Sequence, residues 1–570
     1  MYILGFTEAG HNSAACILKD GKLLTFVEEE RFTRVKSSPG TYPIKASMYC
    51  LLKNNIKLSD VTAIAIGWNL NKYKEFMPKF YSDLNKKYHK DAVTQLTERM
   101  LLERFVKEKV LLKIKQRFLE EGIIDNLPQV KFVDHHLSHA ASSFYCSGFS
   151  EAIAFVIDGA GENLATTIWK CTGEELSLID QYEIPQSLGW FYASITEYLG
   201  FKSNQEEGTV MGLAPYGRNN VNVHKVIDNM LYFENGRYII DPSYIFYGEH
   251  NYGIRFTDKL VNELGKPRNR NSEMTNYYID IAYETQKKLE EVVTELIKYY
   301  IRVLNVHTVC LSGGVTMNCK LNGVISRMKD VKQLFVQPVS DDSGTSLGAA
   351  MIVSKEIGYS PINKLRHAYW GCDFSDMEIE YTLKIAKVNY EKVDNASIIA
   401  AKHLADGKIV GWFCGRAEIG ARALGARSIL ANPSIDGIKD IINSKVKFRE
   451  YWRPFAPSII SERYHDVFGN VKYSPFMLLG LPLNKLSNKD IESTIHIDNT
   501  SRPQVVEKIY NEKYWNLIYE FEKITGIPAV LNTSFNVKGE PIVRTPEEAL
   551  RCFFSTGIDT LFLENYMLVK

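Results

Sequence analysis

The sequence contains nine cysteines but no paired spacing that would indicate a disulfide framework or a zinc site. Their number is odd, they are scattered, and none forms a Cys-x-x-Cys pair. This pattern fits buried thiols in a reducing cytosol. The nine are Cys16, Cys50, Cys146, Cys171, Cys310, Cys319, Cys372, Cys414 and Cys552.

Long apolar runs and a strong net charge are also missing. No apolar run approaches the roughly 18 residues of a membrane span, and no basic stretch precedes the first apolar residues, as it would in a secretory signal. The 68 Lys and Arg residues against 67 Asp and Glu residues give a net charge of +1, so no global field attracts nucleic acid or an anionic membrane. We therefore predict a soluble, cytoplasmic protein that binds neither nucleic acid nor a membrane. A homo-oligomer is compatible with the sequence.

The length of 570 residues exceeds what one hydrophobic core supports, about 250 to 300 residues. We predict two domains, 1–357 and 375–570, joined by a linker at 358–374 that breaks the regular pattern. Near 85–121, a stretch rich in Lys, Leu and Glu has helical spacing, which favours an inserted helical hairpin that packs on the domain over a partner-binding helix. The strands expected in the second domain are 410–413, 476–479, 528–531 and 560–563.

A pattern of strand, polar loop, strand, turn and strand occurs twice in the first domain. Two strands, 308–311 and 334–336, then run into glycine-containing turns that open helices, where backbone amides favour an anion. This duplicated α/β pattern is that of the actin, sugar-kinase and ribonuclease-H-like superfamily of ATP-binding proteins, so we predict that fold. The repeated strands are 2–6, 14–18 and 23–27, then 152–157, 165–169 and 176–179.

Three of the twelve histidines fall within five residues, where 134–141 reads DHHLSHAA. On a helix, His135 and His139 share a face and can bind one cation, although His136 could pair with His139 instead. Asp158 ends the next strand and Asp342 lies in a late loop, so two histidines and two carboxylates can meet, a donor set suited to Fe(II), Zn(II) or Mn(II). The sequence has no His-Glu-x-x-His motif, which argues against a metalloprotease.

The second domain holds the densest cationic stretch. Between residues 416 and 453, eight Lys or Arg residues stand against four Asp or Glu residues, a net charge of +4 (8 − 4) in a chain of +1. The cations alternate with Gly, Ala, Pro and aromatic residues, which favours an inward-facing site for a small phosphate compound over an RNA-binding surface. They are Arg416, Arg422, Arg427, Lys439, Lys445, Lys447, Arg449 and Arg453.

Taken in order along nearly the whole chain, these motifs resemble the O-carbamoyltransferase family that modifies nodulation factors and several antibiotics. The matching stretches include GHNSA at 10–14, ERF at 30–32, DGAGE at 158–162, MGLAPYG at 211–217, ARALGARS at 421–428, RPFAP at 453–457 and NTSFN at 532–536. The resemblance implies an N-terminal domain like that of the tRNA threonylcarbamoyl-adenosine transferases and a YrdC-like C-terminal domain, acting in secondary metabolism such as antibiotic biosynthesis.

By the same resemblance, the C-terminal domain converts carbamoyl phosphate and ATP to carbamoyladenylate, and the N-terminal domain passes the carbamoyl group to a hydroxyl of a small molecule. The metal is iron in studied relatives, Mg²⁺ can accompany ATP, and His11 matches the proposed general base. The implied metal ligands are His135, His139, Asp158 and Asp342. The implied nucleotide-binding residues are Gly159, Gly161, Gly313, Gly314 and Asn318. The implied carbamoyl-phosphate-binding residues are Arg422, Lys447, Arg453, Arg502 and Ser534.

At two positions the match to the family's pattern is incomplete or ambiguous. The family commonly has lysine where Thr209 stands, which concerns acceptor binding, and Asp341 beside Asp342 leaves one metal ligand open, with the spacing favouring Asp342. Two alternative functions remain: a tRNA-modifying threonylcarbamoyl-type transferase, and a noncatalytic actin-like scaffold.

Overall fold

The computed structural model of the chain describes residues 1–7, 10–87, 106–484 and 490–570. The chain forms two compact units: residues 1–24 with 40–364, and residues 25–39 with 365–570. Of the predicted helical hairpin, Leu101, Leu102 and Phe105 lie outside the described residues. Within the described ranges, none of the helices combines the length and the apolar character that crossing a bilayer requires.

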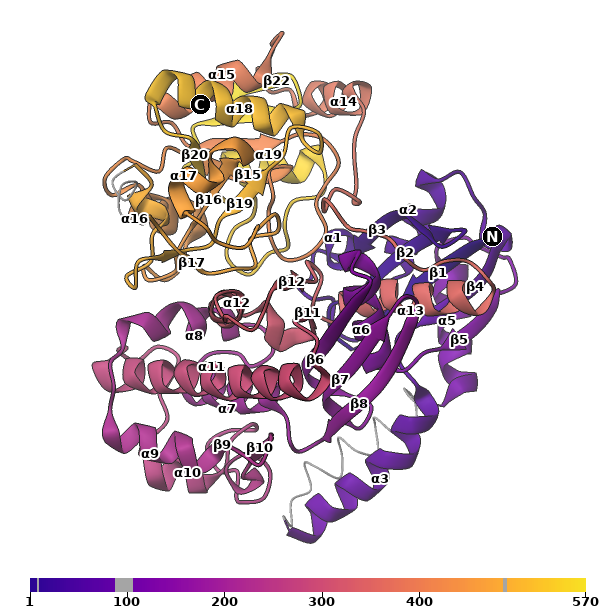
Figure 1. Cartoon of the computed structure of the whole chain (residues 1–570). Helices are drawn as coiled ribbons and strands as arrows, with labels where there is room; N and C mark the ends of the chain where they lie inside the picture. The colour runs from indigo at the N-terminus through magenta and orange to yellow at the C-terminus, as the bar shows by residue number, and fades with distance from the viewer. Residues whose placement is uncertain (8–9, 88–105, 485–489) are drawn as a thin grey trace. The chain divides into compact units, whose positions relative to one another are not determined.

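The first unit contains two five-stranded sheets with the same strand order (Figure 1). In each, the first two strands pair antiparallel and the fourth and fifth join in parallel, so the predicted duplication is confirmed. One sheet has the order β3 (Lys22–Glu28), β2 (Ala14–Lys19), β1 (Tyr2–Phe6), β4 (Val61–Ile66), β5 (Gln129–Phe132). The other has the order β8 (Glu175–Glu183), β7 (Leu164–Thr172), β6 (Glu151–Gly161), β11 (Thr308–Ser312), β12 (Gln333–Val336).

Each repeat ends in a helix that packs against its counterpart, α6 (His135–Ser147) and α13 (Ser343–Glu356). Helix α13 contacts β1, β2 and β4, and α6 contacts β6 and β11. Small residues allow this close approach: a Cβ on Gly348 would lie 1.7 Å from the carbonyl oxygen of Ser138, and one on Gly5 would lie 2.1 Å from that of Ser346. The two helices therefore fix the relative position of the two sheets.

We expect Gly348→Ala to destabilise the protein by about 2 kcal/mol or more, because the added methyl overlaps a backbone oxygen that cannot turn away. Denaturant unfolding measures this change. Gly208→Ala is the matched control, since a Cβ there meets nothing within 4 Å in helix α8 (Glu207–Leu213) and alanine favours a helix. Equal stability of the two variants would contradict the packing described.

Other helices are inserted into this duplicated frame. Helix α5 (Lys107–Glu120) buries Val110, Ile114 and Phe118, which are four residues apart and so share one face; this is the packing expected for the inserted segment. The remaining elements are α2 (Ile44–Lys53), α3 (Leu70–Lys87), α7 (Leu188–Tyr198), α9 (Val221–Met230), β9 (Leu231–Glu234), β10 (Arg237–Ile240), α10 (Asp258–Leu264), α11 (Asn276–Leu304) and α12 (Cys319–Ser326).

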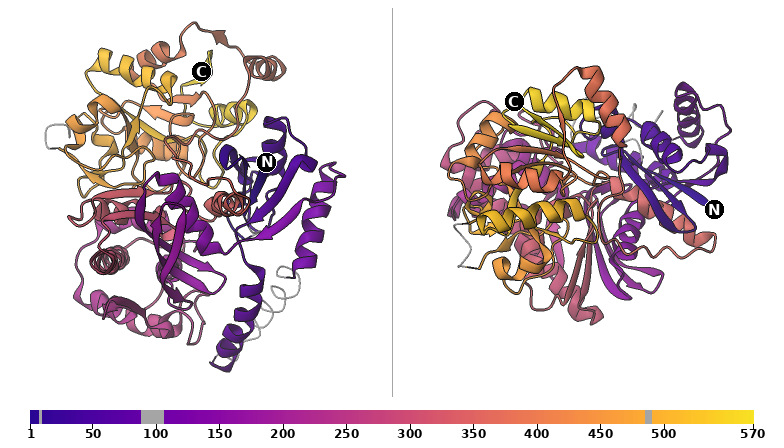
Figure 2. Two further views of the ribbon diagram at one scale, coloured as in Figure 1. Left: turned by 45° about the vertical axis from the view of Figure 1, so that its right-hand side comes forward. Right: turned by 90° about the horizontal axis from the view of Figure 1, so that it is seen from above.

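The second unit is built on a mixed eight-stranded sheet, seen from two further directions in Figure 2. Its order is β13 (Glu391–Lys392), β22 (Tyr566–Val569), β21 (Thr560–Leu563), β14 (Val410–Phe413), β15 (Arg427–Ala431), β20 (Ala529–Ser534), β16 (Ala456–Ile460), β19 (Gln504–Val506), and β17 (Leu481–Pro482) pairs with β18 (Thr500–Ser501). The helices are α14 (Asp376–Ala386), α15 (Ala396–Ala405), α16 (Ile438–Ile442), α17 (Tyr464–Phe468), α18 (Glu512–Thr525) and α19 (Pro546–Phe554).

A segment from near the N-terminus also belongs to the second unit. It comprises the end of β3 and the short helix α1 (Glu30–Thr33). The backbone N–H of Phe26 donates to the carbonyl of Trp370 at 3.1 Å, and Arg416 donates to the Thr25 hydroxyl at 3.0 Å. This assignment could not be predicted from the sequence, because nothing in 25–39 distinguishes the segment from the strand before it.

The predicted α/β class with a duplicated first domain is confirmed by the repeated strand order, and the second unit is also α/β. Its YrdC-like character stays a prediction. Two local predictions are wrong. Residues 476–479 are buried but form no strand, since Met477 has a φ of 54° and interrupts an extended chain. The expected loop after 157 instead continues β6 through a bulge between Ile157 and Gly161.

Candidate active sites

A cluster of four predicted ligands lies in the first unit. The ligand atoms of His135, His139, Asp158 and Asp342 all lie within 4.8 Å of one another. The Nε2 atoms of the two histidines are 3.1 Å apart, and His135 Nε2 is 3.3 Å from Asp158 Oδ2 and 3.7 Å from Asp342 Oδ1. Two nitrogens bound to one metal at about 2.0–2.1 Å are separated by about 2.9 to 3.4 Å, so this spacing fits a shared ion.

Each ligand is positioned by a simple local feature. One helical turn separates His135 from His139 at the start of α6, and the β6 bulge carries Asp158. His135 Nδ1 lies 3.1 Å from the carbonyl of Gly67, which leaves its Nε2 to face the cluster. His136, the alternative ligand, points elsewhere, with its Nδ1 3.1 Å from the Thr167 hydroxyl.

The two adjacent aspartates, Asp341 and Asp342, have different contacts. Asp341 accepts the backbone N–H of Ser343 at 3.1 Å at the start of α13, so it serves the helix end, whereas Asp342 faces His135. The structure thus brings together the four residues favoured from the sequence.

The electrostatics of the cluster are those of a cation site. Burial lowers the pKa of His139 well below its usual value, and the neighbouring His135 lowers it further. For His135 the burial effect is outweighed by Asp158, Asp342 and Glu162, which together raise its pKa to about 9. Burial alone would raise the pKa of Asp158, but the neighbouring histidines lower it. A neutral His139 and an ionised Asp158 are the forms that bind a metal, and a bound metal would displace the proton that the carboxylates stabilise on His135.

The glycines predicted to bind nucleotide surround this cluster. A Cβ on Gly161 would lie 2.3 Å from the His135 ring. Gly313 has a φ of 91°, and a Cβ there would clash with the Ile157 carbonyl. The Gly314 N–H donates to Asp158 Oδ1 at 2.9 Å, which couples the glycine turn to the metal cluster. Asn318 caps α12 and pairs with the Gln286 amide. Gly159 lies in the bulge of β6, and a nucleotide-binding role for these five residues stays a prediction.

His11 lies exposed in the loop between β1 and β2. The next residue, Asn12, accepts a hydrogen bond of 3.0 Å from the hydroxyl of Ser343, the first residue of α13, so this loop adjoins the helix start that carries Asp342. Thr209, at the position where lysine is common, is buried in α8.

In the second unit, the buried Lys447 lies beside Ser534 and is acted on by the charges of neighbouring cations. Lys447 ends a π-helical turn (Asn443–Lys447). Its Nζ lies within hydrogen-bonding distance of four oxygens, the backbone and hydroxyl oxygens of Ser534 at 2.7 and 3.2 Å and two oxygens of Asn536 at 2.6 Å. All four acceptors are uncharged. Burial lowers the pKa of Lys447 well below its usual value, and the charges of Arg449, Arg453 and Lys36 lower it further.

Arg449 belongs to the same group of cations, a role that its place in the basic stretch did not reveal. Burial and then the charges of Arg453 and Arg502 lower its pKa well below the usual value. Its Nε donates to the Asn443 side chain at 2.7 Å. Positive charges held so close repel one another, and a bound anion would relieve that repulsion.

Arg422 lies in the loop Gly420–Gly425, which the sheet holds in place. Gln504 in β19 donates to the Leu424 carbonyl at 2.7 Å, and Asn532 in β20 donates to the Ala423 carbonyl at 3.2 Å. These strands also position the last two predicted residues, since Arg502 lies just before β19 and Ser534 ends β20. Arg422, Arg453 and Arg502 therefore precede neighbouring strands of one sheet, Ser534 ends a strand between them, and Lys447 comes from the π-helical turn.

Comparison with known proteins decides the family. Residues 2–351 match the family description Carbamoyltransferase N-terminus, and residues 401–570 match Carbamoyltransferase C-terminus. The chain belongs to the carbamoyltransferase family. The resemblance noted from the sequence is thereby confirmed, and the chain is a transferase enzyme rather than a noncatalytic scaffold.

Individual relatives extend over most of the chain. It is 36% identical to the uncharacterized protein sll1178 of Synechocystis sp., covering 100% of this chain and 97% of that protein. It is 33% identical to the nodulation protein NolNO of Sinorhizobium fredii, covering 98% and 79%. Among solved structures, component A of the Acidaminococcus fermentans (R)-2-hydroxyglutaryl-CoA dehydratase covers 62% of this chain and 98% of its own at 16% identity, but its TM-score of 0.34 is too low to carry an argument.

Proposed function

We propose that this carbamoyltransferase uses ATP and carbamoyl phosphate to place a carbamoyl group on a hydroxyl of a small molecule, such as a sugar or another natural product. The observation that carries the proposal is the pairing, in one chain of this family, of a group of cations around the buried Lys447 with a two-histidine, two-carboxylate cluster. The first suits a phosphate-bearing substrate, and the second suits a transition metal.

In the second unit, the cations would bind the substrate phosphates. Arg422, Arg453 and Arg502 offer guanidinium groups for phosphate oxygens, and Lys447 supplies a compact charge beside the Ser534 hydroxyl. Hydrolysis of carbamoyl phosphate there consumes one water and gives carbamate and inorganic phosphate. A carbamate oxygen then attacks the α-phosphorus of ATP, accompanied by Mg²⁺, and pyrophosphate leaves as carbamoyladenylate forms. The cations stabilise the negative charge that develops on the phosphate oxygens.

In the first unit, the carbamoyl group would pass to the acceptor. Fe(II) or another divalent transition metal held by His135, His139, Asp158 and Asp342 would act as a Lewis acid toward the carbamoyl carbonyl. Gly159, Gly161, Gly313, Gly314 and Asn318 would hold the adenylate, with the glycine turn fixed through Asp158. His11 would take the proton from the acceptor hydroxyl, whose oxygen attacks the carbonyl carbon while AMP leaves.

The reaction is tested by incubating the purified chain with carbamoyl phosphate, ATP, Mg²⁺ and Fe(II) and following the products by ³¹P NMR. We expect AMP, pyrophosphate and phosphate in equal amounts, formed only when both substrates are present, and a mass gain of one carbamoyl group on an accepted hydroxyl compound. ADP as the main product would contradict the proposal. Incorporation of threonine into tRNA would favour the tRNA-modifying alternative.

A further inference from the structure

The loop that carries Arg422 is held on one side by residues nearly 400 positions earlier in the chain. Arg31 is buried, and its guanidinium donates to the Gly420 carbonyl at 3.1 Å, while the Gly420 N–H donates to the Glu28 carboxylate. Both backbone polar groups of Gly420 are therefore bound by the segment 25–39. Gly420 has a φ of 89°, so this hold acts at the residue where the loop turns.

The other end of the loop is held by a buried acid. Glu418 accepts backbone N–H groups from Leu424 at 2.5 Å and from Ala426 and Arg427 at 3.3 Å. The loop is thus tied at both ends, and Arg422 lies between the ties. The charge of Arg31 also acts on Glu418, so one buried arginine links the two ends electrostatically.

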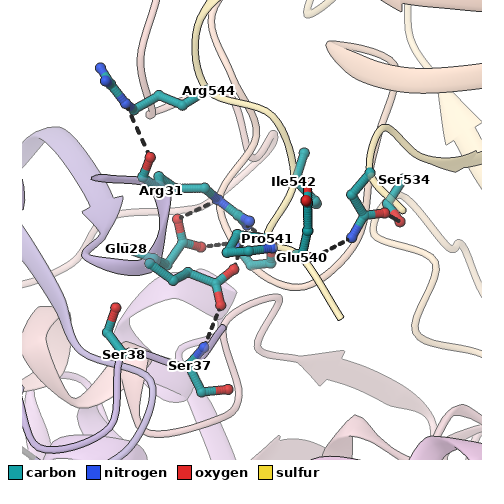
Figure 3. A network of polar contacts seen from close by, with 12 residues as sticks. Glu28, Arg31, Ser37, Ser38, Ser534, Glu540, Pro541, Ile542 and Arg544 are labelled. Carbon is teal, nitrogen blue, oxygen red and sulfur yellow. Dashed lines mark hydrogen bonds and ion pairs between the residues drawn. The ribbon is translucent and has the colours of Figure 1, made fainter. Parts of the chain in front are cut away.

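Arg31 itself is held in place by its own segment. Its Nη1 donates to Glu30 at 2.7 Å and its Nε lies 3.6 Å from Glu28. Figure 3 shows Arg544 reaching back to the Arg31 carbonyl, a hydrogen bond of 3.1 Å. The side chain is therefore pre-organised before any ligand arrives.

Independent contacts keep the segment attached to the second unit. Arg34 donates to the carbonyls of Ile542 at 2.8 Å and Pro541 at 2.9 Å, and it lies 3.1 Å from the Glu548 carboxylate. Loss of the Arg31 guanidinium would leave these contacts in place. The effect of such a change should therefore fall on the Gly420–Gly425 loop rather than on the whole unit.

We propose that Arg31 is a positioning residue of the second site, which fixes the Gly420–Gly425 loop so that Arg422 can bind the phosphate of an acyl phosphate substrate. This inference rests on the proposed function for the identity of the substrate, but its structural part does not. The N-terminal segment 25–39 then contributes to substrate activation by holding a loop of the second unit.

The experiment compares Arg31→Met with Arg268→Met in the full-length chain. Arg268 is a matched control in the first unit, because it is equally buried and also donates to backbone carbonyls, those of Leu199, Arg270 and Ser272. Hydrogen exchange followed by mass spectrometry is read on peptides covering 418–427. We expect exchange there to rise about tenfold or more in Arg31→Met and to stay unchanged in Arg268→Met.

A kinetic measurement on the same proteins separates positioning from general stability. In Arg31→Met the KM for carbamoyl phosphate should rise about tenfold or more, with the KM for ATP and the maximal rate of ATP–pyrophosphate exchange changed less than about threefold. Arg31→Lys should recover part of the loss.

The outcomes are decisive for each claim. Unchanged loop exchange in Arg31→Met, or a parallel rise of both KM values with a fall in the thermal midpoint, would overturn the positioning role. Faster hydrogen exchange of the loop in Arg31→Met, together with a wild type that shows no carbamoyl-phosphate-dependent ATP–pyrophosphate exchange, would instead count against the proposed function alone.

Discussion

His139→Asn will lose its metal and its transfer activity, whereas His136→Asn will keep both. His139 faces the cluster through Nε2, whose position asparagine cannot reach, while His136 contacts the Thr167 hydroxyl through Nδ1, which an asparagine amide can replace. Both side chains are buried in the same helix, so a comparison of the two variants separates the effect of metal binding from the effect of changing a buried side chain. We expect the loss of carbamoyl transfer to exceed about a hundredfold, more than the removal of a ligand's outer partner costs.

The measurement combines metal analysis of the purified variants with the rate of carbamoyl transfer. Circular dichroism and the thermal midpoint check that both variants fold. Wild-type metal content in His139→Asn, or equal loss of metal in His136→Asn, would contradict the assignment of ligands. Metal analysis of the wild type also identifies which ion the site prefers.

Lys447→Met should abolish the use of carbamoyl phosphate while leaving the metal site intact. Methionine has a similar length but no charge, so the variant removes the ammonium that lies beside the Ser534 hydroxyl. A buried ammonium stabilises the charge of a bound phosphate far more strongly than an ammonium in water does. We therefore expect carbamoyl-phosphate-dependent pyrophosphate release to fall by more than about a hundredfold.

Lys513→Met provides the control for loss of a positive charge from the same unit. Lys513 lies at the start of α18 and forms an ion pair with Glu564, outside the group of cations around Lys447. Its replacement should leave pyrophosphate release within about threefold of wild type. A similar loss in both variants would show that net charge, rather than this lysine, governs the activity.

Much of the fold follows from local sequence patterns. The strands of both repeats were predictable because each is a short apolar run bounded by turn residues. The four candidate metal ligands were suggested by helical spacing, by a strand end for Asp158 and by a late loop for Asp342. The choice between His135 and His136 could not be made from spacing alone. It depends on the hydrogen bonds of each ring to Gly67 or Thr167, which are contacts between distant parts of the chain.

Features that depend on long-range packing could not be predicted in this way. The segment 25–39 continues a strand of the first unit, yet its side chains bind loops near 420 and 542. Arg449 looks like any other member of the basic stretch until its neighbours Arg453 and Arg502 are known. The run 476–479 has the composition of a strand, but the left-handed backbone at Met477 prevents one.

The central claim is that one chain holds two separable sites, one that activates the carbamoyl group and one that transfers it. ATP–pyrophosphate exchange measured in the presence of carbamoyl phosphate tests this claim most directly. We expect exchange close to the wild-type rate in His139→Asn, which lacks only transfer, and none in Lys447→Met. Exchange that does not require carbamoyl phosphate, or that is lost equally in both variants, would contradict the account.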